Sequence, residues 1–485
     1  MGWLLFLIIV GFIYFAANKK KGQTTEVIKF PNTPYKPHLN APIIDITNIH
    51  LSAEQKKIFE ILENTNRHIF VTGKAGTGKS VLLQYFRQNS KKRLVVVAPT
   101  GVAALNVNGQ TIHSLFRIPP DFIAKNSLRV NYKVATLLRN LDTVVIDEVS
   151  MVRTDLMDAV DFIFRQARNN NIPFGGVQII MFGDLYQLPP VVGDPELHKY
   201  FVENNGGFYF FNADVWENTS LDIYELMYIF RQEDNSFKEI LNSLRKGKVN
   251  EELLKTINLR SKVEIPGKEV ITLVTTNQLV NEINDFHLSQ LNEKMFEYKA
   301  IVYGNIEQSS FPTEEILRLK KGAQIILLKN DKEKRWVNGS LGYIHSLSNN
   351  EIKVNINGFV YNILQETWSK IRYYYNQEKH KIEEEVVSSF TQYPIRLAWA
   401  MTIHKAQGQT LGSVIIDMGE GAFAHGQTYV ALSRCKSLEG LYLKREIVRE
   451  DIIVDPDVIN FMNNVKILES SEYDMVKKTE DKPNK

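Results

Sequence analysis

Short runs of consecutive apolar residues alternate with helical stretches along most of the chain. In the first half these runs are His68 to Val71, Leu94 to Val97, Thr143 to Ile146 and Gln178 to Met181. Each run is long enough for a strand and too short for a helix. Strands of a parallel sheet are covered on both faces, so continuous apolar runs are typical of them. The pattern therefore predicts a first α/β sheet.

A second group of apolar runs predicts another sheet of the same class. Its members are Val270 to Val274, Ala323 to Leu328 and Ser413 to Ile416, with a helical region from Asn277 to Leu291 after the first. Two α/β domains would then face each other across a cleft. Residues 331–390 differ, because apolar and polar residues alternate there, as in Ile352 to Ile356. We expect a small β insertion in this stretch.

The N-terminal residues 1–17 form an uncharged, mostly apolar segment that Lys19, Lys20 and Lys21 follow. This length lies at the low end of the roughly 17–25 residues that span a bilayer as a helix. The lysines follow the apolar run, which argues against a cleaved signal peptide and favours an uncleaved transmembrane anchor. The catalytic body would be cytoplasmic and tethered to the inner membrane. A buried N-terminal helix, and a cleaved leader or wrong start, are the alternatives.

Composition limits the choice of partner and compartment. Hydrophobic residues make up 44% and charged residues 23% of the 485-residue chain, values typical of a folded protein. The net charge of +3 neither supports nor excludes a nucleic-acid partner, which would need locally clustered Lys and Arg. The single cysteine, Cys435, excludes an internal disulfide and a multi-cysteine metal site, and it fits a reducing compartment. Its ordinary interpretation is a small buried hydrophobe.

The segment from Gly73 to Ser80, GKAGTGKS, has the pattern of a phosphate-binding loop. It follows an apolar run and precedes the helical stretch Val81 to Gln88, as this loop requires. Glycines let backbone N–H groups turn toward phosphate oxygens, Lys79 supplies a positive charge, and Ser80 can bind magnesium. The alternative is a glycine turn with a surface lysine.

Two further strand ends carry polar groups suited to hydrolysis. Asp147 and Glu148 follow the run Thr143 to Ile146, where ligands bind in open α/β sheets. We expect Asp147 to hold Mg²⁺ and Glu148 to orient or deprotonate the attacking water. Gln187 follows the next strand and can contact the γ-phosphate or this water. A solvated turn and an ordinary polar loop are the structural alternatives.

At this point a series of motifs resembles one family. The motifs are residues 73–80, APTGVAALNVNGQTIHS (98–114), IDEVSMV (146–152), GDLYQLPPV (183–191), IFRQ (229–232), LAWAMTIHKAQGQTL (397–411) and YVALSRCKSLEGLYL (429–443). Their order and spacing, from Leu51 to Leu443, resemble the Pif-type (petite integration frequency) DNA helicases. These belong to superfamily one, subclass B, beside the RecD-like motors. The chain looks like a compact version of them.

The resemblance implies an ATP-dependent helicase and translocase that moves 5′ to 3′ on single-stranded DNA, in DNA replication, repair or recombination. Its cofactors would be ATP and Mg²⁺. The implied nucleotide-binding residues are Gln55, Gly73, Gly76, Thr77, Gly78, Lys79 and Ser80, with Ser80 and Asp147 on the metal. Gln55 would read adenine, unless it only begins a helix. Arg231 and Arg434 look like arginine fingers from the second domain; ion-pair arginines are the alternative.

The resemblance also places DNA across both domains. It would contact Thr100, Gly101 and His113 of the first domain, and Thr402, His404 and Lys405 of the second. For the two histidines a structural role is the alternative. Phe116 and Trp336 could stack on bases, although most aromatic residues belong to the core. DNA forks, junctions and quadruplexes are the implied partners, and the motor would be monomeric.

The predicted fold class is α/β, with two tandem RecA-like P-loop domains, a small β insertion in each, and a preceding transmembrane helix. The predicted parts are an anchor (1–18), a linker (19–48), a first domain (49–228) with a wedge-like β insertion (about 116–136), a second domain (229–330 plus 391–465), an SH3-like insertion (331–390) and a disordered tail (466–485). An ordinary surface excursion is the alternative to the wedge.

Two rival functions stay open at this stage. One is an RNA or DNA–RNA hybrid helicase with the same ATP site, because no motif detects a 2′-hydroxyl. The other is a membrane-tethered, nucleotide-dependent DNA-binding switch without productive turnover. The presence of Lys79, Glu148, Arg231 and Arg434 argues against this switch.

Overall fold

The computed structural model describes residues 50–119, 122–123, 128–232, 234–267 and 270–468. The first domain is built on a six-stranded parallel sheet in the order β3-β2-β4-β5-β1-β6. Its strands are β1 (His68–Gly73), β2 (Leu94–Ala98), β3 (Gln110–Thr111), β4 (Thr143–Ile146), β5 (Gln178–Phe182) and β6 (Leu221–Leu226). All four predicted runs are strands, and β3 and β6 complete the sheet.

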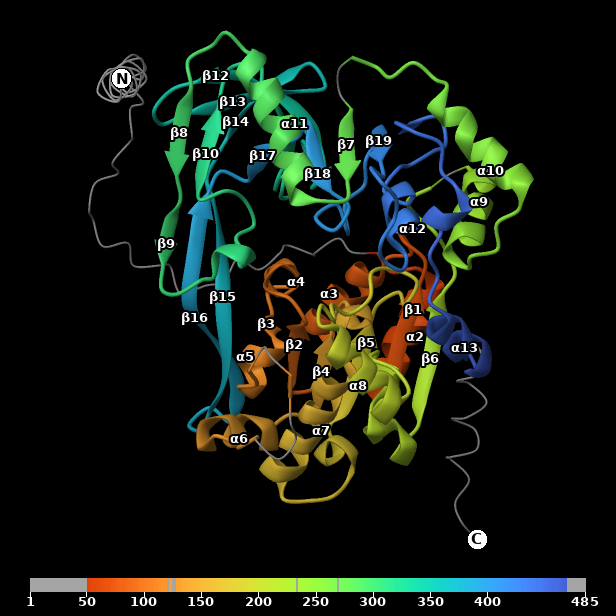
Figure 1. The fold of residues 1–485 in the computed structure, drawn as a ribbon. Coiled ribbons are helices and arrows are strands. Elements are labelled where there is room, and N and C mark those ends of the chain that lie inside the picture. The colour runs from red at the N-terminus through yellow and green to blue at the C-terminus, as the bar shows by residue number, and fades with distance from the viewer. Residues whose placement is uncertain (1–49, 120–121, 124–127, 233, 268–269, 469–485) are drawn as a thin grey trace, which may run out of the picture.

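Both faces of this sheet are covered, which explains its apolar runs. Ile69 and Val71 of β1 pack in one cluster with residues of α2 (Ala53–Asn64) and α3 (Lys79–Asn89). Phe70, between them, belongs to the cluster on the other face, with α7 (Thr154–Arg168). Each fully buried side chain of this size contributes about 1.5–3 kcal/mol. Figure 1 shows the sheet between helices in the lower part of the molecule.

The second domain has a four-stranded parallel sheet in the order β18-β7-β19-β20. The strands are β7 (Ile271–Val274), β18 (Ala400–Thr402), β19 (Val414–Asp417) and β20 (Leu441–Leu443). The domain's helices are α9 (Asn235–Arg245), α10 (Glu251–Asn258), α11 (Asn277–Gln290) and α12 (Gln427–Leu432). The later helix α13 (Pro456–Asn464) lies beside the first domain (Figure 1), where Phe461 stacks on Phe211. The predicted runs at 270–274 and 413–416 are strands of this sheet.

The run from Ala323 to Leu328 was assigned to the wrong sheet. It forms β11 (Gln324–Leu327), which pairs antiparallel with β12 and β17 in a separate five-stranded sheet, ordered β14-β13-β12-β11-β17. The other strands are β12 (Leu341–Leu347), β13 (Ile352–Ile356), β14 (Phe359–Ile363) and β17 (Ile395–Leu397). A fully buried apolar run looks the same whichever sheet it joins. The predicted β insertion exists, but its sheet includes strands on both sides of residues 331–390.

A long hairpin connects this insertion to the first domain. Its strands are β15 (Glu366–Asn376) and β16 (Lys381–Gln392), and Figure 1 shows it running down beside the first domain. The Tyr373 backbone N–H donates to Gln110 Oε1 over 3.3 Å, and Val96 N donates to the Tyr373 hydroxyl over 3.3 Å. Arg87 and Glu384 form an ion pair at 2.6 Å. The insertion therefore contacts the first domain through this hairpin, as well as the second domain from which it extends.

The predicted wedge-like β element is wrong for the described part of residues 116–136. This part contains no strand; helix α5 (Ile112–Phe116) ends at its beginning, and α6 (Tyr132–Arg139) begins near its end. Ile123 is buried in the first-domain core, and its N–H donates to Asp155 Oδ2 over 3.2 Å. Packing against α7 organises this segment instead of strand pairing.

The predicted fold class also needs a correction at the membrane helix. Among the described residues no helix is long and apolar enough to cross a membrane. The longest of them, α7, has 15 residues, which at 1.5 Å per residue is shorter than the roughly 30 Å hydrocarbon core. The predicted anchor (1–18) and linker (19–48) lie outside the described residues, as does most of the predicted tail (466–485). The described fold is two RecA-like α/β domains with a β insertion.

Candidate active site

The phosphate-binding loop joins β1 to α3, and two of its glycines have a backbone conformation that a side chain would strain. Gly76 and Gly78 both have φ of +82°, in the left-handed region that favours glycine. A Cβ atom on Gly76 would lie 2.4 Å from Arg231 Cβ, and Phe230 N donates to Gly76 O over 2.9 Å. The loop therefore packs directly against the segment that leads into the second domain.

Lys79 and Ser80 occupy the first turn of α3. The Lys79 ammonium donates to Gly73 O over 2.6 Å and to Lys74 O over 3.1 Å, and burial lowers its pKa. Thr77 is buried and donates to Lys74 O, whereas the Ser80 side chain is exposed. Backbone N–H groups and a lysine at a helix N-terminus make a site for phosphate groups.

Gln55 lies beside this loop and also begins a helix. Its Oε1 accepts from Ser52 N over 3.0 Å, in a capping box at the start of α2. Its Nε2 donates to Gly78 O over 3.3 Å. The structural alternative for Gln55 is thus present, at a place adjoining the phosphate loop.

Asp147 and Glu148 follow β4 at the same sheet edge. Burial, reinforced by the Glu148 carboxylate, raises the pKa of Asp147 to about 7. Burial also raises the pKa of Glu148, against the opposing effects of Lys79 and Arg434. Glu148 has φ of +51°, a strained conformation that persists only where the surroundings impose it. A carboxylate with a raised pKa in a strained turn suits a general base.

Gln187 is connected to both domains by hydrogen bonds. Its Nε2 donates to Asp184 Oδ2 over 3.3 Å, and both residues are buried after β5. Its Oε1 accepts from Nε2 of Gln407, a second-domain residue, over 3.1 Å. The same Gln407 nitrogen donates to Glu148 Oε2 over 3.3 Å. The structure thus brings the predicted residues Glu148 and Gln187 together through Gln407.

Arg231 and Arg434 reach the same region from the second-domain side. Arg231 donates to Ser433 O over 3.2 Å and to Gly408 O over 3.3 Å. Arg434 is 1% exposed and donates to Val430 O over 2.9 Å. Burial, then Arg231, lower the pKa of Arg434 to about 9, while Glu148 partly opposes this shift. Arg434 therefore interacts electrostatically with both Arg231 and Glu148.

The residues predicted to contact DNA lie after strand ends in the two domains. Thr100 caps α4 (Gly101–Asn106) by accepting from Ala103 N over 3.2 Å. A Cβ atom on Gly101 would lie 2.2 Å from Ser310 Oγ, so the loop before β10 (Ile316–Leu319) packs closely here. His113 is half-buried in α5, and burial together with Arg153 lowers its pKa.

On the second domain, Thr402 ends β18 and is buried, whereas His404 and Lys405 are exposed. The Thr402 hydroxyl accepts from Lys405 N over 3.2 Å. Of the two aromatic candidates, Phe116 is 2% exposed and packs edge-on against Phe164. It is a core residue and not a stacking surface. Trp336 is half-buried beside Tyr361 and Arg335.

Four residues of this region were not predicted from the sequence: Gln407, Asp184, Tyr429 and Arg245, of which the last two bind the Asp184 carboxylate. Three of them lie inside the motifs that the sequence displays, so the motifs marked the place but not the residue. Arg245 lies in no motif. Its one signal is its position on the apolar face of α9, four residues after Leu241 and eight after Phe237.

A phosphate loop and raised-pKa carboxylates in one α/β domain, approached by arginines of a second, define a nucleotide hydrolase whose site two domains share. Comparisons with known proteins identify the family to which this hydrolase belongs. The profile of the PIF1-like helicases matches residues 50–255. The ATP-dependent DNA helicase Pif1 of Bdellovibrio bacteriovorus is 31% identical over 435 residues, covering 87% of this chain and 93% of the relative.

Another relative and two solved structures support the same family. The ATP-dependent DNA helicase PIF1 of Emericella nidulans is 32% identical over 87% of this chain, which spans only 64% of that relative. A Bacteroides Pif1 structure with ADP-AlF4 has a TM-score of 0.79 at 36% identity, covering 86% of this chain and 97% of the other. A single-stranded-DNA-bound structure of Bacteroides Pif1 scores 0.62 at 37% identity, with the same coverage. The chain therefore belongs to the PIF1-like family of ATP-dependent DNA helicases.

Proposed function

We propose that this chain is an ATP-driven motor that moves 5′ to 3′ along single-stranded DNA and unwinds the duplex ahead of it. The observation that carries the proposal is the position of Gln407. This second-domain side chain donates to both Glu148 and Gln187 of the first domain. A change of the nucleotide near Glu148 and Gln187 would therefore alter the hydrogen bonds of Gln407 in the second domain. A two-domain motor requires such a connection between its nucleotide site and its second domain.

In the proposed reaction the phosphate loop and Lys79 bind the triphosphate, and Glu148 orients the attacking water. Arg231 and Arg434 neutralise the charge that develops on the transferred phosphoryl group. Ser80 and Asp147 would hold Mg²⁺, which supplies charge neutralisation between the phosphates. Their hydroxyl and carboxylate oxygens are ligands that Mg²⁺ prefers, and a cation would favour the charged form of Asp147, whose pKa burial raises.

The proposed DNA surface crosses the strand ends of both domains. It includes Thr100, Gly101 and His113 on one side and Thr402, His404 and Lys405 on the other. Hydroxyls, backbone amides and lysine bind phosphates without reading bases, so we expect salt-sensitive and sequence-neutral affinity. The DNA-bound Bacteroides structure supports DNA as the partner by family likeness. Forks and junctions are the substrates we propose.

Strand displacement on forked DNAs with a single 5′ or 3′ tail tests activity and polarity together. We expect ATP-dependent unwinding with the 5′ tail alone, and no unwinding by Lys79→Ala protein. Unwinding from a 3′ tail would contradict the direction, and absence of both activities would contradict the motor. Forks with RNA tails distinguish the RNA-helicase alternative. A quadruplex placed before the duplex tests the wider substrate range.

A further inference from the structure

A buried ion pair joins the two domains behind the candidate active site. Arg245, the last residue of α9, is 2% exposed, and Asp184, just after β5, is 1% exposed. Arg245 donates through Nε over 3.2 Å and through Nη2 over 3.0 Å, both to Asp184 Oδ1. Its Nη1 donates to Glu225 of β6 over 3.1 Å, and its guanidinium lies 4.4 Å from the centre of the Tyr186 ring. Arg245 is therefore fixed on three sides by the first domain.

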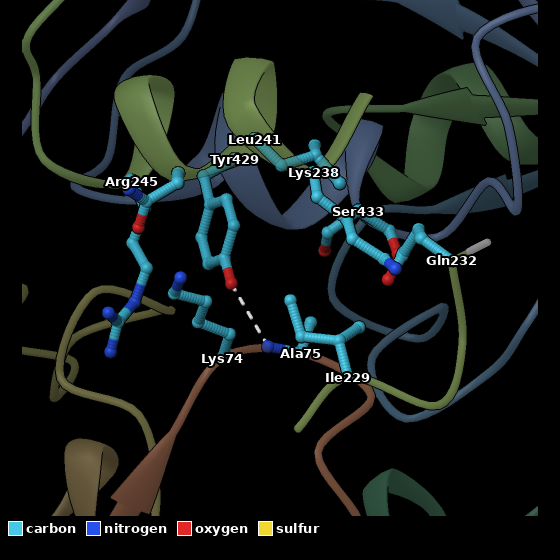
Figure 2. A pocket seen from close by; sticks show the side chains of 10 residues that line it. Lys74, Ala75, Ile229, Gln232, Lys238, Leu241, Arg245, Tyr429 and Ser433 are labelled. Carbon is cyan, nitrogen blue, oxygen red and sulfur yellow. Dashed lines mark hydrogen bonds between the residues drawn. The ribbon is translucent and has the colours of Figure 1, made fainter. Parts of the chain in front are cut away.

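Tyr429 attaches the phosphate loop to the same carboxylate. Its hydroxyl accepts from Ala75 N over 3.0 Å and donates to Asp184 Oδ2 over 3.4 Å. Figure 2 shows the Tyr429 side chain reaching the backbone of Ala75, with Arg245 beside it. Burial raises the pKa of Tyr429, so its hydroxyl keeps the proton that it donates. Two second-domain side chains thus meet on one first-domain carboxylate.

The charge of Asp184 fixes the direction of the hydrogen bonds that lead from it to Glu148. Burial alone would raise its pKa, but Arg245 and Lys79 outweigh burial and hold the pKa below its ordinary value. An ionised carboxylate only accepts hydrogen bonds. Gln187 must therefore turn its Nε2 toward Asp184, which leaves its Oε1 to accept from Gln407. Gln407 then turns its Nε2 toward Glu148.

We propose that Arg245 is a positioning residue for ATP hydrolysis, acting through the chain Asp184–Gln187–Gln407–Glu148. By clamping Asp184, it holds both glutamine amides in the orientation that keeps Glu148 and Gln187 aligned on the attacking water. Because α9 and Gln407 belong to the second domain, the alignment exists only while the two domains are packed together. This inference rests on the proposed function, since it names a part of the same hydrolytic site.

Two single variants of the full-length protein test the role of the pair. Arg245→Lys keeps the charge but loses the planar group that binds Asp184 and Glu225 together. Asp184→Asn keeps the shape of the side chain but can present an N–H donor to Gln187. The side-chain amide of Gln187 could then flip and present its oxygen instead of its nitrogen. For both we expect kcat for DNA-stimulated ATP hydrolysis to fall about 10- to 100-fold, with the KM for ATP within about threefold of wild type. Trapping of ADP with aluminium fluoride should be lost while ADP binding is retained.

Controls separate positioning from folding. Arg445→Met breaks a half-buried ion pair of the second domain, with the buried Asp451, outside the chain of amides; its folded protein should keep the wild-type kcat. The double variant Arg245→Met with Asp184→Leu removes both buried charges, so we expect it to fold, as thermal unfolding would show, and still to hydrolyse ATP slowly. If the double variant regained wild-type kcat, or if both single variants kept it, the proposal would be overturned.

The wild-type protein separates this proposal from the proposed function. Absence of DNA-stimulated ATP hydrolysis in the wild-type protein would contradict the proposed motor function. The role of Arg245 would then be decided by comparing how well the wild type and Asp184→Asn trap ADP with aluminium fluoride. Trapping by the wild type but not by Asp184→Asn would support the positioning role. Equal trapping by both would contradict it.

Discussion

The two halves of the nucleotide site are built in different ways. In the first domain, the phosphate loop, Asp147 and Asp184 directly follow β1, β4 and β5, so one sheet edge positions them. In the second domain, Arg231 lies on the connection between the domains, and Arg434 follows the short helix α12. These groups reach the site only because the domains pack together. In the proposed function this difference separates nucleotide binding, which we expect the first half to provide, from turnover, which we expect to need both.

The largest expected effect comes from breaking the first half. Lys79→Ala removes the charge on the triphosphate and should reduce both ATP binding and turnover, with turnover falling about 1,000-fold or more. Glu148→Gln should retain binding and lose turnover, because it removes only the base. Fluorescent-nucleotide binding and phosphate release measure the two quantities. Near-normal unwinding by either variant would contradict the assigned role.

Breaking the second half should leave binding intact. Arg434→Ala should lower DNA-stimulated turnover by a factor on the order of 10³, because a fixed guanidinium acts on the transition state. ATP affinity should change little. Arg449→Ala, at an exposed arginine of the same domain, is the matched control. Equal losses of ATP affinity and turnover for Arg434→Ala would contradict the separation of the two halves.

A smaller effect is expected at the contact between the halves. Gln407→Ala removes the donor that Glu148 and Gln187 share, and should lower kcat about 10-fold without a matching change in KM. Steady-state kinetics at saturating DNA measure both constants. An unchanged kcat would contradict the role of Gln407, both in the proposed motor and in the hydrogen-bond chain that leads from Arg245 to Glu148.

The smallest effect concerns stability and pH. Burial raises the pKa of Asp147 from 3.8 to about 7, so its protonated form favours the folded state. Its contribution to stability is full below about pH 4 and is lost as pH rises through about 7. Asp147→Asn cannot ionise, and should raise the unfolding midpoint by about 2–4 °C at pH 8 but not at pH 4. Equal midpoint differences at both pH values would contradict the raised pKa.

The same contrast explains what the sequence could predict. The first half was predictable because strand, loop and helix are adjacent in the chain, and the glycine, lysine and carboxylate positions have fixed spacing. The second half was predictable only through family likeness. Arg245 was missed because its partner Asp184 is 61 residues away, across a domain interface. For Phe116 the sequence favoured the core over base stacking without deciding between them, because aromatic residues give the same signal in a core as on a surface.

The insertion shows a second limit of sequence reasoning. Its alternating strands predicted a β element, yet β11 looked like a strand of the parallel sheet, because it is buried throughout. The contact of Tyr373 with β2 joins residues 277 positions apart, and no local pattern indicates it. Local periodicity thus predicts elements, while the pairing of distant elements depends on packing.

The most direct test of the shared site is a structure of this protein with ADP, aluminium fluoride and single-stranded DNA. We predict that the guanidinium groups of Arg231 and Arg434 both lie within hydrogen-bond distance of the fluoride group, opposite Lys79. If either arginine pointed away from the loop between Gly73 and Ser80, turnover could not depend on closure of the two domains.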